Sequence, residues 1–105
     1  MIVYEGLPER TEEGGFLVLQ NGMELSPKLS QTIINHSPNG FSWGYGGSGP
    51  AQLALALLLE EVGARRARVL YQQFKWEVIA RLPQDQPWQL TSDQILDWVN
   101  TQGSP

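Results

Sequence analysis

The sequence predicts an α+β fold, in which a small antiparallel N-terminal sheet packs with about three helices, the central one buried. The sheet is indicated by β-forming residues on both sides of an Asn21-Gly22 pair, the strongest short-range signal for a hairpin. The buried helix is indicated by residues 53–59, all of which are apolar. A chain of 105 residues with 41% hydrophobic residues is typical of one globular domain, so we expect a single domain over residues 1–105.

The predicted sheet begins with the β-rich run at residues 2–5, which ends at Gly6 and Pro8. Residues 16–20 form the next predicted strand and residues 23–25 begin the return strand. Asn and Gly are the residues that a two-residue type I′ turn requires between such strands, because both tolerate positive φ.

Two predictions concern the segment that follows the hairpin. Residues 29–35 contain Thr32, Ile33 and Ile34, and these β-branched side chains favour a short strand. Residues 37–40 have the order Ser-Pro-Asn-Gly, which is typical of a tight turn.

The central helix is predicted from its two ends and its interior. Pro50 is suited to the first turn of a helix, and Gly63 is suited to a left-handed stop. Between them, apolar side chains point in nearly every direction and only Gln52, Glu60 and Glu61 interrupt them. A helix that is apolar all round is buried all round.

Residues 64–82 predict a second helix that ends before Pro83. Its core face consists of apolar residues at helical spacing: Ala67, Leu70, Tyr71, Phe74, Val78 and Leu82. Within residues 74–80, apolar and polar side chains also alternate, so a strand remains the alternative for this stretch.

The last predicted helix begins at Thr91 or Ser92, since Thr91 and Gln94 have the spacing of a capping box. Its apolar face is Ile95, Leu96, Trp98 and Val99. We expect Trp88 and Leu90 to anchor the preceding turn, and residues 101–105 to fray.

Composition and charge restrict the classes of function. The net charge of −4 disfavours attraction to nucleic acid or to an anionic membrane. The absence of cysteine excludes disulfides and thiolate sites, and a lone His36 without an acidic cluster predicts no metal site and no cofactor. Without a basic, apolar leader or a long apolar span, we expect a cytoplasmic protein.

The charge is also unevenly distributed along the chain. Residues 1–27 contain five glutamates and one arginine, whereas residues 64–82 contain five basic residues and one glutamate. These two segments could attract each other within the fold or between two copies of the chain.

The loop from Gly44 to Gly49 matches the letters of the dinucleotide-binding pattern G-x-G-x-x-G. The context does not fit, because the following helix leads into another helix rather than into a second parallel strand. A weaker anion site remains, made by Gly46, Gly47, Ser48 and Gly49 at the start of the helix, with His36 nearby.

Such a site would need a cation, because a helix end contributes only about 0.3–2 kcal/mol whereas millimolar affinity needs about 4 kcal/mol. No basic residue lies between Lys28 and Arg65, so only tertiary placement of Arg65, Arg66 or Arg68 could supply one. The structural alternative is that the glycines allow close backbone approach while Trp43 and Tyr45 pack over the core. A triad of His36 with a serine and an aspartate has no geometric support in the sequence, so an enzyme is less expected.

One face of the second helix suggests an interaction surface. It comprises Arg65, Arg68, Val69, Lys75, Trp76 and Ile79. Tryptophan and arginine are enriched where binding energy concentrates, so this face is the candidate contact for a protein partner or a second copy. Nucleic-acid binding through the same basic and aromatic residues is a lesser alternative, since the net charge opposes it.

The segment Asn35-His36-Ser37-Pro38, followed by Gly40-Phe41 and by residues 43–54, WGYGGSGPAQLA, resembles a family of small uncharacterised bacterial and phage proteins classed as a domain of unknown function. Tyr71-Gln72, Phe74-Lys75 and Leu82-Pro83 extend the resemblance. It implies that the loop and the central helix belong together as one unit, and it brings no activity, substrate or cofactor. We therefore expect a non-enzymatic interaction or regulatory module, and keep small-ligand or phosphoester binding as the alternative.

Overall fold

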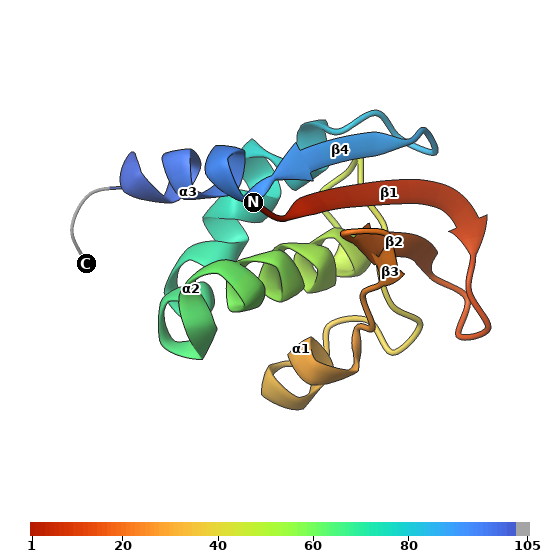
Figure 1. Cartoon of the computed structure of the whole chain (residues 1–105). Helices are drawn as coiled ribbons and strands as arrows, with labels where there is room; N and C mark the ends of the chain where they lie inside the picture. The colour runs from red at the N-terminus through yellow and green to blue at the C-terminus, as the bar shows by residue number, and fades with distance from the viewer. Residues whose placement is uncertain (103–105) are drawn as a thin grey trace.

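The structure, a computed structural model that describes residues 1–102, contains one antiparallel four-stranded sheet in the order β3-β2-β1-β4 (Figure 1). Its strands are β1 (Val3–Arg10), β2 (Phe16–Gln20), β3 (Met23–Glu24) and β4 (Trp88–Thr91). The helices are α1 (Lys28–Ile33), α2 (Ser48–Glu77) and α3 (Ser92–Asn100), with a 3₁₀ turn, η1 (Ile79–Arg81). The predicted α+β fold is therefore confirmed.

The hairpin of β2 and β3 turns at Asn21 and Gly22, as predicted, with φ values of 49° and 82°. β1 begins where the sequence indicates a strand but continues through Pro8 to Arg10. The ladder between β1 and β2 is irregular between Leu7 and Arg10, and this interruption accommodates a residue that has no N–H to donate.

The prediction of a strand at residues 29–35 is wrong, because this segment forms α1. Its hydroxyl groups bond to nearby carbonyls at helical spacing: Ser30 Oγ donates to Pro27 O at 2.8 Å, and Thr32 Oγ1 donates to Leu29 O at 2.6 Å. Bonds from the central helix outweigh the β preference of three branched residues, since Gln52 Nε2 donates to Ser30 Oγ and to Ile34 O. The turn at residues 37–40 is confirmed by a bond from Gly40 N to Ser37 O.

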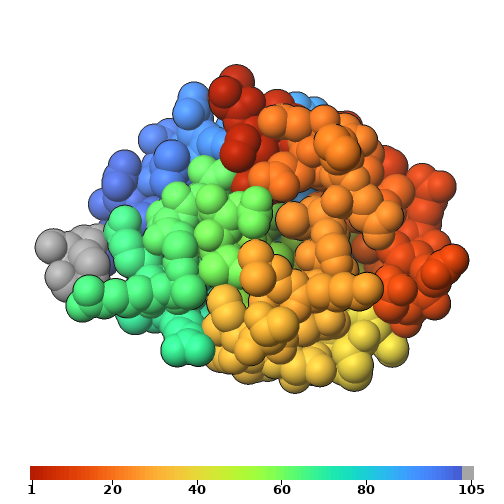
Figure 2. Space-filling view, turned by 60° about the horizontal axis from the view of Figure 1, so that its bottom comes forward, coloured from red at the N-terminus to blue at the C-terminus, as the bar shows by residue number. Residues whose placement is uncertain are grey.

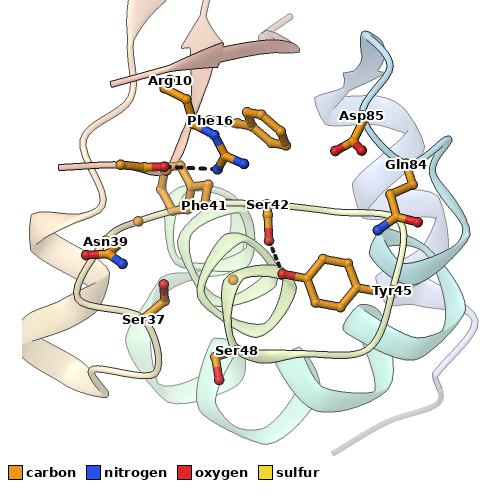
Figure 3. Close-up of a pocket in the computed structure, with 14 residues that line it drawn as sticks. Arg10, Phe16, Ser37, Asn39, Phe41, Ser42, Tyr45, Ser48, Gln84 and Asp85 are labelled. Carbon is orange, nitrogen blue, oxygen red and sulfur yellow. Dashed lines mark hydrogen bonds between the residues drawn. The ribbon is translucent and has the colours of Figure 1, made fainter. Parts of the chain in front are cut away.

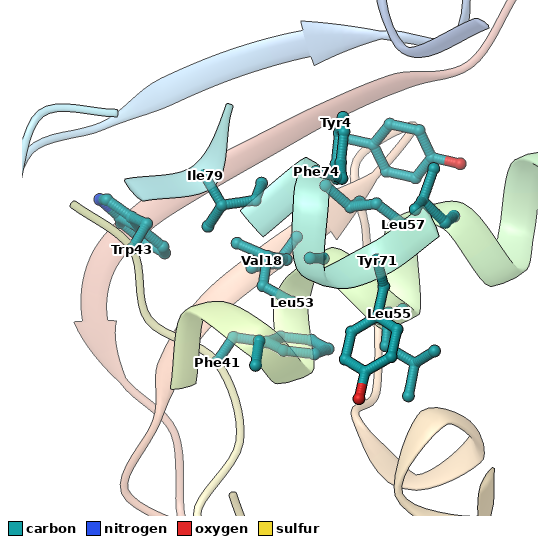
Figure 4. Packing of buried hydrophobic residues seen from close by; sticks show 14 of the residues in the cluster. Tyr4, Val18, Phe41, Trp43, Leu53, Leu55, Leu57, Tyr71, Phe74 and Ile79 are labelled. Atoms are coloured by element: carbon teal, nitrogen blue, oxygen red, sulfur yellow. The ribbon is translucent and has the colours of Figure 1, made fainter. Parts of the chain in front are cut away.

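α2 is two helical segments joined at Gly63, whose φ of 83° and ψ of 171° end the first segment as predicted. Every residue of 49–58 is buried, and Figure 4 shows Leu57 of this segment among Val18 of the sheet and Phe74 of the second segment. The first segment therefore lies in the core between the sheet and the returning helix. Within residues 1–102, no helix combines the length and the apolar character needed to cross a membrane.

The second segment of α2 is helical to Glu77 and is followed by η1, so residues 74–77 are not a strand. Of its predicted core face, Ala67, Tyr71 and Phe74 are buried. The others pack against the core while partly exposed, namely Leu70, Val78 and Leu82.

β4 is the one strand that the sequence does not predict, since Trp88 and Leu90 lie in a strand rather than in a turn. It pairs with β1, and Trp88 lies opposite Gly6, where a Cβ would come within 2.1 Å of the indole nitrogen. α3 then begins with the predicted capping box of Thr91 and Gln94. Of the residues expected to fray, 103–105 lie outside the described part of the chain.

Candidate functional site

A cavity of about 650 Å³ lies beside the glycine-rich loop, where the loop meets the turn after β1 and the connection before β4 (Figure 3). We call it the loop cavity. Charged, amide and hydroxyl side chains line much of it, including Arg10, Asn39, Ser42, Tyr45, Ser48, Gln84 and Asp85. Of the predicted ligand-binding residues, Ser48 and Gly49 line the cavity, whereas His36, Gly46 and Gly47 are not among its lining residues.

The glycines of the loop each permit a close contact. A Cβ at Gly46 would lie 2.2 Å from the Trp76 ring, and one at Gly47 would lie 2.5 Å from the Tyr45 ring. A Cβ at Gly49 would lie 2.1 Å from Ser42 Oγ. These close approaches explain the glycines by packing alone, which is the structural alternative that the sequence predicts for the loop. Trp43 is fully buried, whereas Tyr45 is 45% exposed.

The cation at the loop cavity is Arg10, which lies too far from the loop along the sequence to be predicted as part of its site. Its Nη1 donates to Gly14 O at 2.9 Å, and its guanidinium carbon lies 4.2 Å from the centre of the Phe16 ring. The hairpin register places Arg10 opposite Phe16, and a bridge from Phe16 to Phe41 joins the hairpin to the loop. Hairpin pairing was thus the signal that could have brought Arg10 to this site.

Asp85 lies across the loop cavity from Arg10, in the connection before β4 (Figure 3). Its φ of 60° is in the left-handed region, which aspartate and asparagine tolerate better than most residues. The neighbouring Gln84 backbone presses against Gly44, and Gly44 N donates to Ile79 O at 3.1 Å. The wall that carries Asp85 is therefore fixed to the start of the glycine-rich loop.

His36 belongs to a different environment. Its Nε2 lies 2.7 Å from Tyr71 OH, so the ring is bound to the second segment of α2. Gln52, which is fully buried, holds the backbone around it: Oε1 accepts from the N–H groups of His36 and Ser37 at 2.8 and 3.0 Å. The arrangement fixes the loop to the central helix, and neither residue is aimed at the loop cavity.

A second buried polar cluster joins the sheet to both helices that pack on it. Tyr4 OH donates to Glu61 Oε2 at 2.6 Å, and Ser92 Oγ donates to the same oxygen at 3.0 Å. Burial, with the bond to the Glu61 carboxylate, raises the pKa of Tyr4 well above its ordinary value. The phenol therefore stays protonated as a donor, and the cluster connects β1, α2 and α3.

The predicted interaction face is only partly exposed. Val69 is 69% exposed and Trp76 is 57% exposed, and Arg65 and Arg68 are also at the surface. Lys75 is buried with its Nζ 4.4 Å from the centre of the Trp76 ring. Ile79 is fully buried because η1 turns it into the core, so it is not available at this surface.

Glu77, the last residue of α2, connects the second segment of this helix to α3. It accepts hydrogen bonds from Gln73 Nε2 and from Trp98 Nε1, the latter at 2.9 Å. These two bonds, that of Gln73 first, lower the pKa of Glu77 because they favour its charged form. Within residues 1–102, no group of three His, Asp or Glu side chains is placed to hold a metal ion.

We expect Glu77→Gln to flatten the acid side of the stability profile. A lowered folded-state pKa means that Glu77 stabilises the fold above the ordinary glutamate pKa of about 4.3. This contribution is lost as the pH falls through the lowered value. Thermal unfolding followed by circular dichroism should show a steeper loss of melting temperature below about pH 4.3 in the parent chain than in the variant. Asp97→Asn, at an exposed position of α3, should keep the parent profile, and equal slopes for all three chains would contradict this role of Glu77.

A family model described as a family of unknown function (DUF6166) matches residues 4–101. The match includes the hairpin, the glycine-rich loop and all three helices. Comparisons with curated proteins and with solved structures give no match.

Proposed function

We propose that this chain, which belongs to the family of unknown function DUF6166, is a non-enzymatic interaction module that binds a second copy of itself. The observation that carries the proposal is an exposed Trp76 on the same helix face as two exposed arginines, with a matching acidic surface elsewhere on the molecule. One copy would present its basic surface to the acidic surface of the next.

The basic surface, which we call the basic stripe, consists of Arg65, Arg68, Val69 and Trp76. Steps of three, four and seven residues place them on one face of the second segment of α2. Leaving an apolar side chain exposed forgoes about 1.5–3 kcal/mol of burial, so the exposure of Trp76 favours a surface that is covered in use.

The acidic surface, which we call the acidic hairpin, surrounds the connection from β1 to β2. Its exposed carboxylates are Glu9, Glu12, Glu13 and Glu24. They line a groove of about 410 Å³ together with Leu17 and Arg10. Leu17, which lines the groove and is partly exposed, adds an apolar contact. The acidic hairpin thus offers both the charge and the apolar surface that complement the basic stripe.

The two surfaces lie toward opposite ends of a molecule whose longest extent is 38 Å, as the red-orange hairpin and the teal part of α2 show in Figures 1 and 2. They therefore cannot meet within one chain. A symmetric contact of stripe on stripe would bring arginines of both copies together, which costs energy through like-charge repulsion. A head-to-tail contact avoids this repulsion and uses both surfaces.

Charge exchange tests the proposal with purified protein. The first variant combines Arg65→Glu with Arg68→Glu, and the second combines Glu12→Arg with Glu13→Arg. Light scattering of the parent chain should show a mass that rises with concentration and falls with added salt, because salt screens surface charge. Each variant alone should stay monomeric, whereas an equal mixture of the two should associate again, since each then carries the complement of the other.

Arg81→Glu is the matched control, because Arg81 is an exposed cation on η1 outside the basic stripe. It should leave association unchanged. A parent chain that stays monomeric at all concentrations and salts, or variants that fail to associate on mixing, would refute self-association.

Small-ligand binding at the glycine-rich loop is the second candidate function. The loop cavity, with Arg10 in its wall, is the observation that favours it. His36 has no place in this version, since it does not line the cavity.

A further inference from the structure

We infer that the loop cavity is a binding site for a small zwitterion, such as a free amino acid or a dipeptide with charged ends. The inference rests on small-ligand binding at the glycine-rich loop and is independent of self-association through the basic stripe. Its evidence is two opposite charges that face one cavity from different walls, and an exposed aromatic ring on a third side of it (Figure 3).

The size and the lining of the loop cavity suit a small polar molecule. Its volume of about 650 Å³ falls within the range of ligand sites, roughly 300–1,000 Å³. Ser42, Asn39 and Gln84 add hydroxyl and amide groups, which can accept from an ammonium or donate to a carboxylate. A purely apolar ligand would leave these groups without partners.

Arg10 provides the positive wall in a fixed orientation. One guanidinium nitrogen is bound to Gly14 O, and the plane lies over the Phe16 ring, which restricts the side chain. A guanidinium has five N–H donors, so the bond to Gly14 leaves donors for a carboxylate. Figure 3 shows the guanidinium directed into the space between the hairpin and the loop.

Asp85 provides the negative wall. Its carboxylate faces the same space from the opposite side in Figure 3. Within residues 1–102, no ion pair joins Asp85 to Arg10, whose own contacts are Gly14 and Phe16. A simple anion at Arg10 would be opposed by Asp85, and a simple cation at Asp85 would be opposed by Arg10. A molecule that carries both charges can pair its carboxylate with Arg10 and its ammonium with Asp85.

Tyr45 lines the loop cavity from the glycine-rich loop, on a third side from Arg10 and Asp85, and can contact the body of the ligand (Figure 3). Its ring is 45% exposed, rests on Gly47, and is fixed by a bond between its hydroxyl and Ser42 Oγ at 2.8 Å. A rigid aromatic surface of this kind favours an apolar or aromatic substituent. The site therefore fits an amino acid such as phenylalanine better than glycine.

Three ligands of similar shape test the two charges one at a time. L-phenylalanine carries both the ammonium and the carboxylate, 3-phenylpropionate carries only the carboxylate, and 2-phenylethylamine carries only the ammonium. Titration into the full chain, followed by amide chemical shifts, should show saturable binding of L-phenylalanine with shifts at Ser42, Tyr45 and Gln84. We expect each singly charged probe to bind at least about 10-fold more weakly, since a charge-assisted hydrogen bond contributes about 1.5–3 kcal/mol. Glycine should also bind more weakly, because it has no side chain for Tyr45.

Two variants assign the charges. Arg10→Gln should abolish the advantage of L-phenylalanine over 2-phenylethylamine, and Asp85→Asn should abolish its advantage over 3-phenylpropionate. Asparagine tolerates the left-handed backbone at position 85, so the second variant should fold normally. Arg81→Gln is the control, since Arg81 is exposed and does not line the loop cavity.

Three results would overturn the zwitterion site. The first is equal binding of L-phenylalanine, 3-phenylpropionate and 2-phenylethylamine, and the second is the absence of saturable shifts with any of them. The third is that inorganic phosphate shifts the same amides as strongly as L-phenylalanine. None of these results bears on self-association, because light scattering of Asp85→Asn should match the parent chain whether or not the loop cavity binds a ligand.

Discussion

Replacing Gln52 by leucine is expected to destabilise the fold by about 3–5 kcal/mol, although leucine is close to glutamine in volume and the site is fully buried. The Gln52 amide makes four hydrogen bonds. It accepts from the N–H groups of His36 and Ser37, and its Nε2 donates to Ser30 Oγ at 2.9 Å and to Ile34 O at 3.2 Å. Leucine would leave three of these groups, the N–H groups of His36 and Ser37 and the Ile34 carbonyl, without this partner, at about 1–3 kcal/mol for each one kept from water.

Urea denaturation followed by circular dichroism measures this loss. Gln72→Leu is the matched control, because Gln72 is exposed on the same helix and its replacement should change the free energy of unfolding by no more than about 0.5 kcal/mol. If the two variants lose equal stability, the loop does not depend on Gln52 for its conformation.

Gly44→Ala is expected to destabilise the fold by at least about 3 kcal/mol. Gly44 has a φ of 86°, and a Cβ there would lie 2.5 Å from the Gln84 Cα. The contact is with backbone, so no side-chain rotation can relieve it. Alanine would have to push the connection before β4 away from the loop, and this connection also carries Asp85.

Gly22→Ala is the control that separates the steric clash at Gly44 from the cost of placing alanine in the left-handed region. Gly22 has nearly the same φ, 82°, but a Cβ there would meet no atom within 4 Å. Gly22→Ala should therefore destabilise the fold only by the left-handed penalty of about 1–2 kcal/mol. Thermal and urea unfolding of both variants would give the difference, and a Gly44→Ala chain no less stable than Gly22→Ala would show that the connection can yield without cost.

The elements that could be predicted are those whose signals are local. Asn21-Gly22 determines a turn by its own backbone preference, Gly63 ends a helix, and Thr91 with Gln94 begins one. The central helix follows from its apolar composition alone. In each case the residues that carry the signal are within a few positions of the feature.

The elements that could not be predicted depend on distant partners. α1 has the composition of a strand, and it is helical because Gln52 of the central helix bonds to Ser30 within it and to Ile34 at its end. β4 has only four residues, and it is a strand because β1 offers a free edge and Gly6 leaves room for Trp88. Ile79 fits the exposed helical face by spacing, but α2 ends before it.

The residues of the loop cavity also fall into those that local sequence predicts and those that it does not. The glycine-rich loop was visible in the sequence as a candidate, whereas Arg10 and Asp85 come from segments far away along the chain. Only the pairing of β1 with β2, and the contact of Gly44 with Gln84, bring them to one place. Neither residue is close enough to the loop in sequence to be predicted as part of its site.

The position of β4 next to β1 also determines when the protein can become stable during its synthesis. Ile2 and Ser92 are 90 positions apart: Ser92 N donates to Ile2 O, and Ile2 N donates to Ser92 Oγ, which itself donates to Glu61. A nascent chain can form the first hairpin early, because those contacts are local, but β1 has no partner on its other edge until the C-terminal part of the chain leaves the ribosome. Until then the apolar first segment of α2 lacks part of its cover, so the newly made chain exposes an aggregation-prone helix from the time that this segment leaves the ribosome until α3 has followed it.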